Sequence, residues 1–207
     1  MKHKRISLFL SVIILAIGLI AAGCSGEEPP VSTGQLPENE QEETKGQVET
    51  KKQESGSLQS FTAVTLDGGT FTQEDIQGKD VTVINFWATY CGPCLSEMPD
   101  LAEFAGALPE NVQVVTVCLD GAGDQETAER ILSEAGYEGV TLLSGDGDFL
   151  TLCGSIRYVP TTVFVDGEGN LWGEVIIGGQ TNLSEAFLKQ VNALLQDRGK
   201  EEISLEK

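Results

Sequence analysis

The residues of this chain best suited to chemistry are two cysteines separated by two residues, Cys91 and Cys94. They follow the apolar, β-branched run 81–88 and open a segment with apolar residues at spacings of three and four, which predicts a strand and then a helix. Backbone N–H groups and the dipole at a helix N-terminus favour an anion, so we expect a lowered pKa for the Cys91 thiol. Cys94 would lie on the same helical face, within reach of a disulfide bond.

Two other interpretations of this pair are open. Half of a zinc site has the same spacing, but the chain has no second pair of this kind, and its only histidine is His3. A purely structural disulfide is the remaining alternative. Pro93 suits the first turn of a helix because it has no N–H group to lose there. We therefore expect thiol–disulfide chemistry and no metal or other cofactor.

The elements that would position the cysteines alternate between strands and helices. The run 61–72 predicts a hairpin that turns at 67–69, and 161–166 with 171–177 predicts a second hairpin. Further strands are expected at 81–88, 112–119 and 140–143. A helix opened by the two cysteines is expected, with a kink at Pro99 and an apolar inner face of Leu95, Met98, Leu101, Ala102, Ala105 and Leu108. Further helices are expected at 124–135, at 182–196 and, as a short turn, at 148–153. This order predicts an α/β three-layer sandwich of about 140 residues.

Composition excludes several classes of function. The chain has 207 residues, and 13 Lys and Arg against 32 Asp and Glu give a net charge of −19. So acidic a surface repels phosphate backbones, which argues against nucleic-acid binding. If the N-terminal segment is removed, no histidine remains for a Ser-His or Cys-His catalytic pair.

The N-terminus has the composition of a targeting segment. A basic start at 1–5 precedes the almost wholly apolar stretch 6–20, and Ala21-Ala22-Gly23-Cys24 follows. This pattern resembles a bacterial lipoprotein signal covering residues 1–23, which implies that Cys24 becomes the lipid-modified N-terminus. Ala21 stands where such signals usually carry Leu. An uncleaved membrane anchor is the alternative, and both place the remaining chain outside the cytoplasm.

A linker and a folded part follow this segment. Residues 24–57 contain eight Glu and three Lys but few large aliphatic residues, so we expect an acidic, disordered spacer. The folded domain is expected at 58–198, with a charged tail at 199–207.

Three motifs together resemble the thioredoxin superfamily. They are the active-site signature from Phe86 to Cys94 (FWATYCGPC), the cis-proline loop Val159-Pro160-Thr161-Thr162, and Pro99 in the helix. Within the superfamily the chain resembles the membrane-tethered TlpA/ResA-like proteins, because of its leader, Asn85 and the run from Cys94 to Pro99. The resemblance implies a thioredoxin-like fold with a mixed central sheet and an N-terminal hairpin.

The resemblance also implies roles for single residues. Cys91 and Cys94 would form the redox-active disulfide, and Gly92, Pro93, Val159 and Pro160 would complete the active-site loops. Asn85 stands where thioredoxins carry a buried Asp, and Thr116 is expected where they carry a Lys. Glu97 lies at the position at which ResA-like proteins carry a glutamate that takes part in proton handling. A solvated surface carboxylate is the alternative for Glu97.

Four other residues are judged individually. Tyr90 replaces the commoner Trp before the first cysteine, and Trp87 is expected to pack in the core. Cys118, on a predicted buried strand, and Cys153 lie outside the recognised motifs. In an oxidising compartment these two cysteines either form a second disulfide or remain free thiols.

The function implied is disulfide reduction outside the cytoplasm, through a mixed-disulfide intermediate. The implied partners are disulfide-bearing envelope proteins, a membrane electron donor of the CcdA/DsbD type, and the membrane itself through the lipid. A monomer is expected. The alternatives are a peroxiredoxin-like peroxide reductase, whose Pro-x-x-x-Thr-x-x-Cys motif is absent here, and a non-enzymatic binding lipoprotein on the same fold.

Overall fold

The computed structural model describes residues 56–205, which contain a seven-stranded mixed sheet. Its strand order is β2-β1-β5-β4-β3-β6-β7. The predicted signal segment, Cys24 and nearly all of the predicted linker lie outside the described residues. The strands are β1 Thr62–Thr65, β2 Thr70–Thr72, β3 Val81–Trp87, β4 Val112–Cys118, β5 Val140–Gly145, β6 Thr161–Asp166 and β7 Leu171–Ile177.

The central strand β3 positions the site. All seven of its residues are buried, as expected for a strand covered on both faces. It pairs in parallel with β4, which pairs in parallel with β5, and it pairs antiparallel with β6. The strand therefore ends beside the end of β4 and the start of β6.

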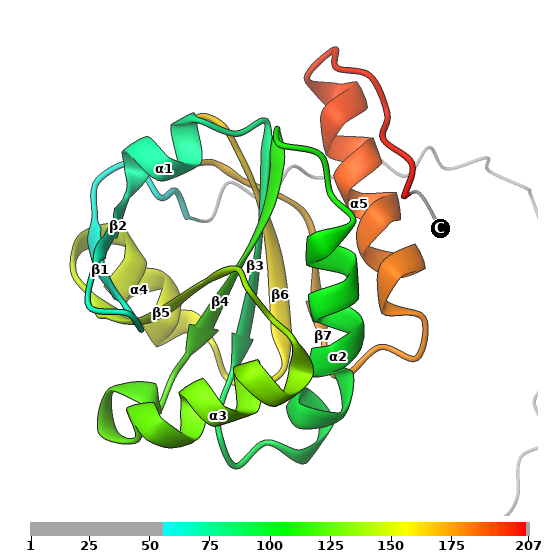
Figure 1. Cartoon of the computed structure of the whole chain (residues 1–207). Coiled ribbons are helices and arrows are strands. Elements are labelled where there is room, and N and C mark those ends of the chain that lie inside the picture. The colour runs from blue at the N-terminus through cyan, green and yellow to red at the C-terminus, as the bar shows by residue number, and fades with distance from the viewer. Residues whose placement is uncertain (1–55, 206–207) are drawn as a thin grey trace, which may run out of the picture. The chain divides into compact units, whose positions relative to one another are not determined.

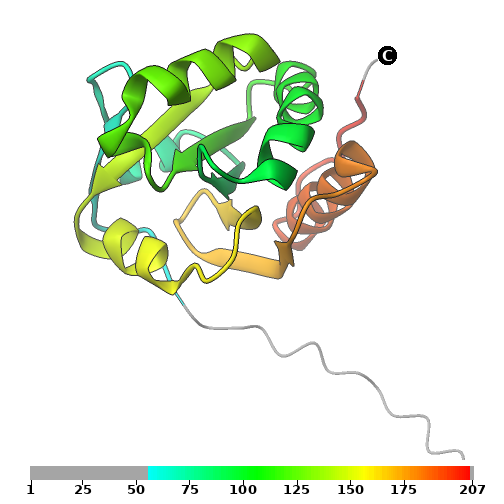
Figure 2. The same cartoon turned by 90° about the horizontal axis from the view of Figure 1, so that it is seen from below.

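Helices cover both faces of this sheet (Figure 1). They are α1 Gln73–Gln77, α2 Gly92–Gly106, α3 Gln125–Ala135, α4 Gly147–Ser155 and α5 Leu183–Asp197, with a short 3₁₀ turn at Gly121–Gly123. One core cluster joins the sheet to α2, α3 and α5, and a second joins its other face to α1 and α4. Figure 2 shows α3 and α4 on opposite sides of the sheet. The three-layer α/β sandwich with a mixed sheet and an N-terminal hairpin is thus confirmed.

Several boundaries differ from the sequence prediction. Helix α1 was not expected, and α4 and β5 are longer than expected. Helix α2 runs through Pro99 and ends at Gly106, before Leu108. Leu95, expected on its inner face, is exposed, while Glu97 and Phe104 are buried. The face of α2 that packs against the core therefore differs from the face predicted from its aliphatic residues alone.

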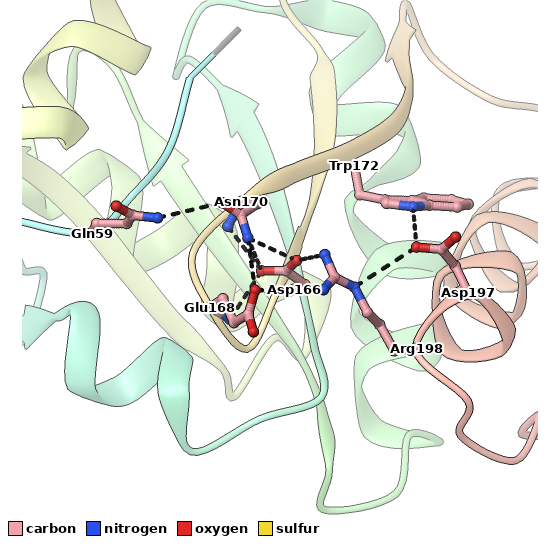
Figure 3. Close-up of polar contacts among 7 residues, drawn as sticks. All are labelled: Gln59, Asp166, Glu168, Asn170, Trp172, Asp197 and Arg198. Atoms are coloured by element: carbon pink, nitrogen blue, oxygen red, sulfur yellow. Dashed lines mark hydrogen bonds and ion pairs between the residues drawn. The ribbon is translucent and has the colours of Figure 1, made fainter. Parts of the chain in front are cut away.

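The turn between β6 and β7 is tied to the end of α5 by a polar cluster (Figure 3). Asp166 is 2% exposed, accepts hydrogen bonds from the backbone N–H groups of Glu168 and Asn170 at 2.9 and 2.8 Å, and pairs with the Arg198 guanidinium. Gly169 (φ +81°) completes the turn, where a Cβ atom would lie 2.6 Å from the Leu58 carbonyl oxygen. The polar cluster therefore holds the C-terminal end of α5 against the β6–β7 turn.

The domain continues past the predicted boundary at Arg198. The Asn192 side chain exchanges two hydrogen bonds of 2.9 Å with the backbone of Ile203, and Lys200 pairs with Asp80 at 2.9 Å. Ile203 and Leu205 pack against the core cluster of α2 and α5. The first part of the predicted charged tail is therefore part of the domain.

Replacing Asp166 with Ala is expected to lower the free energy of unfolding by about 3 kcal/mol, because it leaves the Arg198 guanidinium and two turn N–H groups without their acceptor. Urea denaturation measures this change. The control is Glu168→Ala, whose side chain is 73% exposed and meets Arg198 only at 3.5 Å. We expect it to cost less than about 1 kcal/mol. Equal losses in the two variants would contradict the assigned role of Asp166.

Candidate active site

The two cysteines form a disulfide bond at the N-terminus of α2. Cys91 is the N-cap residue, and its sulfur accepts a hydrogen bond from the Cys94 backbone N–H at 3.2 Å. The sulfurs are 2.01 Å apart and the Cα atoms 5.3 Å apart. Gly92 and Pro93 form the exposed first turn of the helix. The sequence prediction of a bonded pair at a helix start is confirmed.

The loop predicted to complete the active site contains the cis peptide bond Val159–Pro160, as the motif predicted. Val159 packs against the core cluster that includes both cysteines. The Pro160 carbonyl oxygen accepts a hydrogen bond from the Gly178 N–H at 2.8 Å. A Cβ atom on the next residue, Gly179, would lie 3.6 Å from Cβ of Pro93. The segment after β7 therefore runs between the cis-proline loop and the first turn of α2.

Glu97 is part of a buried polar network. It is 6% exposed, which excludes the solvated surface carboxylate considered from the sequence. Its Oε2 atom accepts a hydrogen bond from the Gln180 backbone N–H at 3.0 Å, and Oε1 accepts one from Asn85 Nδ2 at 3.4 Å. Asn85 Nδ2 also donates to Thr162 Oγ1 at 2.9 Å. The network connects α2 to strands β3 and β6 and to the segment after β7.

Burial raises the pKa of Glu97 above its ordinary value of 4.5, although the hydrogen bonds from Gln180 and Asn85 act in the opposite direction. The nearby charge of Asp100 raises it further. The folded domain thus holds the Glu97 proton more tightly than the unfolded chain does, so this residue's contribution to stability falls as pH rises through the raised pKa. A carboxyl with a raised pKa on the same helical face as Cys94, three residues away, is suited to exchanging a proton with it.

Asn85 occupies the place predicted for it. In the sheet it lies opposite Thr116 of β4 and Thr162 of β6, so the predicted position of Thr116 on the neighbouring strand is confirmed. The Thr116 hydroxyl lies 2.7 Å from that of Thr141, and both are buried. No Asp–Lys pair can form at these positions, and Glu97 is the ionisable group of the network.

The aromatic residues of the signature have different environments. Trp87 is fully buried in the core, as predicted, and its Nε1 atom has no hydrogen-bond partner in the described part of the chain. Tyr90 is 80% exposed, directly before Cys91. Its ring is therefore free to contact a partner at the disulfide.

The two remaining cysteines of the domain are free thiols, so the possible second disulfide between Cys118 and Cys153 is absent. Cys118 belongs to the core cluster on the α2 side of the sheet, while Cys153 packs against the cluster on the other side. Burial raises the pKa of Cys118 to about 12 and that of Cys153 to about 11. Neither thiol has the character of a reactive thiolate.

Two contacts of the site were missing from the sequence prediction. Thr162 was noted only as part of the proline motif, although its place opposite Asn85 follows once β3 and β6 are paired. The Gln180 backbone N–H has no local signal, because its contact with Glu97 joins residues 83 positions apart.

Within residues 56–205, no three Cys, His, Asp or Glu side chains converge in the manner of metal ligands. In the same part of the chain, no helix combines the length and apolar character needed to cross a membrane.

The amino-acid sequence is similar to those of known proteins. The Redoxin family model matches residues 53–177, which is more than half of the chain. The thiol-disulfide oxidoreductase ResA of Halalkalibacterium halodurans is 29% identical over 64% of this chain and 73% of its own length. ResA of Oceanobacillus iheyensis is 30% identical over 61% of this chain and 64% of its own length.

Solved structures share the fold. The structure of MTB dsbF is 29% identical, covers 66% of this chain and 96% of its own, and has a TM-score of 0.54. A secreted Mycobacterium tuberculosis disulfide oxidoreductase homologous to E. coli DsbE is 27% identical over 62% of this chain and 93% of its own, with a TM-score of 0.51. Together with the family model and the ResA relatives, this likeness shows that the chain belongs to the Redoxin family, as a ResA-like thiol–disulfide oxidoreductase of the thioredoxin superfamily.

Proposed function

We propose that this protein reduces disulfide bonds of proteins outside the cytoplasm through the dithiol form of Cys91 and Cys94. The observation that carries the proposal is the placement of a bonded cysteine pair at the start of α2, with the second cysteine on the buried face that also holds Glu97. The helix N-terminus favours the thiolate of Cys91, which makes it the attacking group.

The proposed reaction has two exchange steps. The Cys91 thiolate attacks one sulfur of the substrate disulfide, that bond breaks, and the released substrate thiolate takes up a proton. Cys94 then gives its proton to Glu97 and attacks the Cys91 sulfur. The bond between Cys91 and the substrate breaks, and the second substrate thiolate takes up the proton that Glu97 holds. The substrate gains two electrons and the Cys91–Cys94 pair loses them. A dithiol donor in the membrane, of the CcdA/DsbD type, would return two electrons and two protons.

The location proposed for this reaction rests on the N-terminal sequence. The basic start, the apolar stretch and the Ala-Ala-Gly-Cys run favour a lipid attached to Cys24. The acidic segment that follows would separate the domain from the membrane surface. Disulfide-bearing envelope proteins are the substrates that such a tethered domain would meet.

Catalysis of insulin-disulfide reduction by dithiothreitol tests this function. The protein is expected to accelerate the reaction, and Cys91→Ser is expected to abolish the acceleration because the attacking sulfur is lost. Cys153→Ser is the matched control, since it removes a thiol on the other side of the sheet and is expected to leave the rate unchanged. An unaccelerated reaction, or undiminished activity in Cys91→Ser, would exclude the proposal.

A further inference from the structure

The backbone just before Cys91 is held by a carboxylate from outside its own strand and helix. Asp120 lies two residues beyond the end of β4. Its Oδ1 atom accepts a hydrogen bond from the Thr89 backbone N–H at 2.9 Å, and Oδ2 accepts one from Thr89 Oγ1 at 2.5 Å. One carboxylate thus binds both donors of Thr89.

The Asp120 carboxylate also accepts a hydrogen bond from a third donor. The Cys118 thiol, which is buried on β4, donates a hydrogen bond to Asp120 Oδ1 at 3.3 Å. Although partial burial alone would raise the pKa of Asp120, the hydrogen bonds from Thr89 hold it below the ordinary value. Asp120 is therefore an ionised acceptor, whose bonds are stronger than those of a neutral group.

Thr89 lies within the turn that carries Cys91. The Cys91 backbone N–H donates to the Ala88 carbonyl oxygen at 3.1 Å and closes this turn between β3 and α2. On the opposite strand, the Leu119 N–H donates to the Trp87 carbonyl oxygen at 2.9 Å. Asp120 therefore connects the middle of the turn to the end of β4, at the place where the paired strands separate.

We propose that Asp120 is a positioning residue for Cys91. Through its hydrogen bonds to Thr89, Asp120 fixes the turn before Cys91 and hence the direction from which the Cys91 sulfur approaches a substrate disulfide. The inference rests on the proposed function in taking Cys91 as the attacking thiol. Exchange needs the attacking sulfur in line with the substrate's S–S bond, so a turn released from Asp120 lowers the rate of attack without removing any reacting atom.

The test measures attack by Cys91 on oxidised glutathione in the full chain carrying Cys94→Ser, which cannot resolve the product. The thiolate of Cys91 displaces one glutathione thiolate, and mass spectrometry of acid-quenched samples gives the rate and the modified residue. Asp120→Asn and Thr89→Val are each expected to slow attack about tenfold. The double variant is expected to be no slower, because both substitutions disrupt the same interaction between Asp120 and Thr89. Thr89→Ser keeps both donors and is expected to react within about twofold of the parent.

The matched control is Asp124→Ala. Asp124 is an exposed carboxylate that caps α3 through the Thr127 N–H, so its loss affects stability but does not touch the turn. Its attack rate is expected to equal that of the parent. A parent-like rate in Asp120→Asn, equal slowing in Asp124→Ala, or a double variant slowed by the product of the two single effects would overturn the inference.

Two further outcomes keep the inference separate from the proposed function. If Asp120→Asn does not fold, equal rates in Thr89→Val and Thr89→Ser would overturn the inference. If Cys91 in the parent takes up no glutathione, the assignment of Cys91 as attacking thiol fails, whatever the effect of Asp120.

Discussion

Replacing Cys94 with Ser is expected to leave protein substrates covalently bound to Cys91. The attack by Cys91 needs only its own thiolate, whereas release of the substrate needs the second sulfur, which lies on the buried face of α2. Without that sulfur the mixed disulfide has no internal route to resolution. Non-reducing electrophoresis and mass spectrometry of the purified variant would show adducts that disappear on reduction.

The complementary variant separates the roles of the two cysteines. Cys91→Ser keeps the buried thiol of Cys94 but loses the attacking group, so it is expected to trap no substrate. Cys153→Ser in the Cys94→Ser background is the control for adducts on other thiols, because Cys153 is the partly exposed free thiol of the domain, and it is expected to trap as much as the parent. Trapping by Cys91→Ser but not by Cys94→Ser would reverse the assigned order of attack.

Replacing Glu97 with Gln is expected to slow resolution of the mixed disulfide by roughly 10²-fold, within the usual range for general acid–base catalysis. The buried Cys94 thiol must lose a proton before it attacks, and Asn85 is an amide that cannot accept one. Glutamine keeps the size of Glu97 and an oxygen for the Gln180 N–H but is no base. Decay of the mixed disulfide, measured by acid quenching and mass spectrometry, gives the rate.

The pH dependence of this decay identifies the base. In the wild-type protein the rate is expected to rise as pH passes through the raised pKa of Glu97, because only the ionised carboxylate accepts a proton. Glu97→Gln is expected to lose this rise. Asp100→Asn is the matched control: burial still raises the Glu97 pKa, but the smaller contribution of the Asp100 charge is lost, so the rise moves slightly to lower pH with an unchanged plateau. Superimposable profiles for wild type and Glu97→Gln would exclude a proton-transfer role.

Asn85→Asp in the Glu97→Gln background provides a rescue test. It places a carboxylate at the buried position where thioredoxins carry Asp, next to the side chain of residue 97. Partial recovery of the resolution rate is expected, since the new group is a base in the same network. No recovery in a folded variant would mean that the position of the carboxylate, and not its presence, determines the rate.

Much of the fold was predictable because it depends on local pattern. The buried runs of β3 and β4 are continuous and β-branched, and the β6–β7 hairpin has the predicted strand limits. Helix α1 was missed because five residues are too few to show a helical period. Its capping box of Thr72 and Asp75 was the signal that would have found it.

The site was predictable only where a motif marks it. The bonded cysteines and the cis-proline loop carry such motifs, but the burial of Glu97 comes from contacts with Asn85 and Gln180, which are distant in sequence. With these contacts, Glu97 is buried and Leu95 is exposed, against the ordinary preference of both residue types. The hydrogen bonds of Asp120 to Thr89 join residues 31 positions apart and likewise leave no local trace.

The reduction potential of the Cys91–Cys94 pair tests the central claim most directly. The pair would be equilibrated with dithiothreitol and with glutathione buffers of known potential, and the oxidised fraction read by thiol alkylation and mass spectrometry. A reductant with the Gly-Pro dipeptide of thioredoxin is predicted to have a potential near that of thioredoxin, roughly −270 mV. A value near about −120 mV, that of a strong disulfide-forming oxidant, would contradict the account.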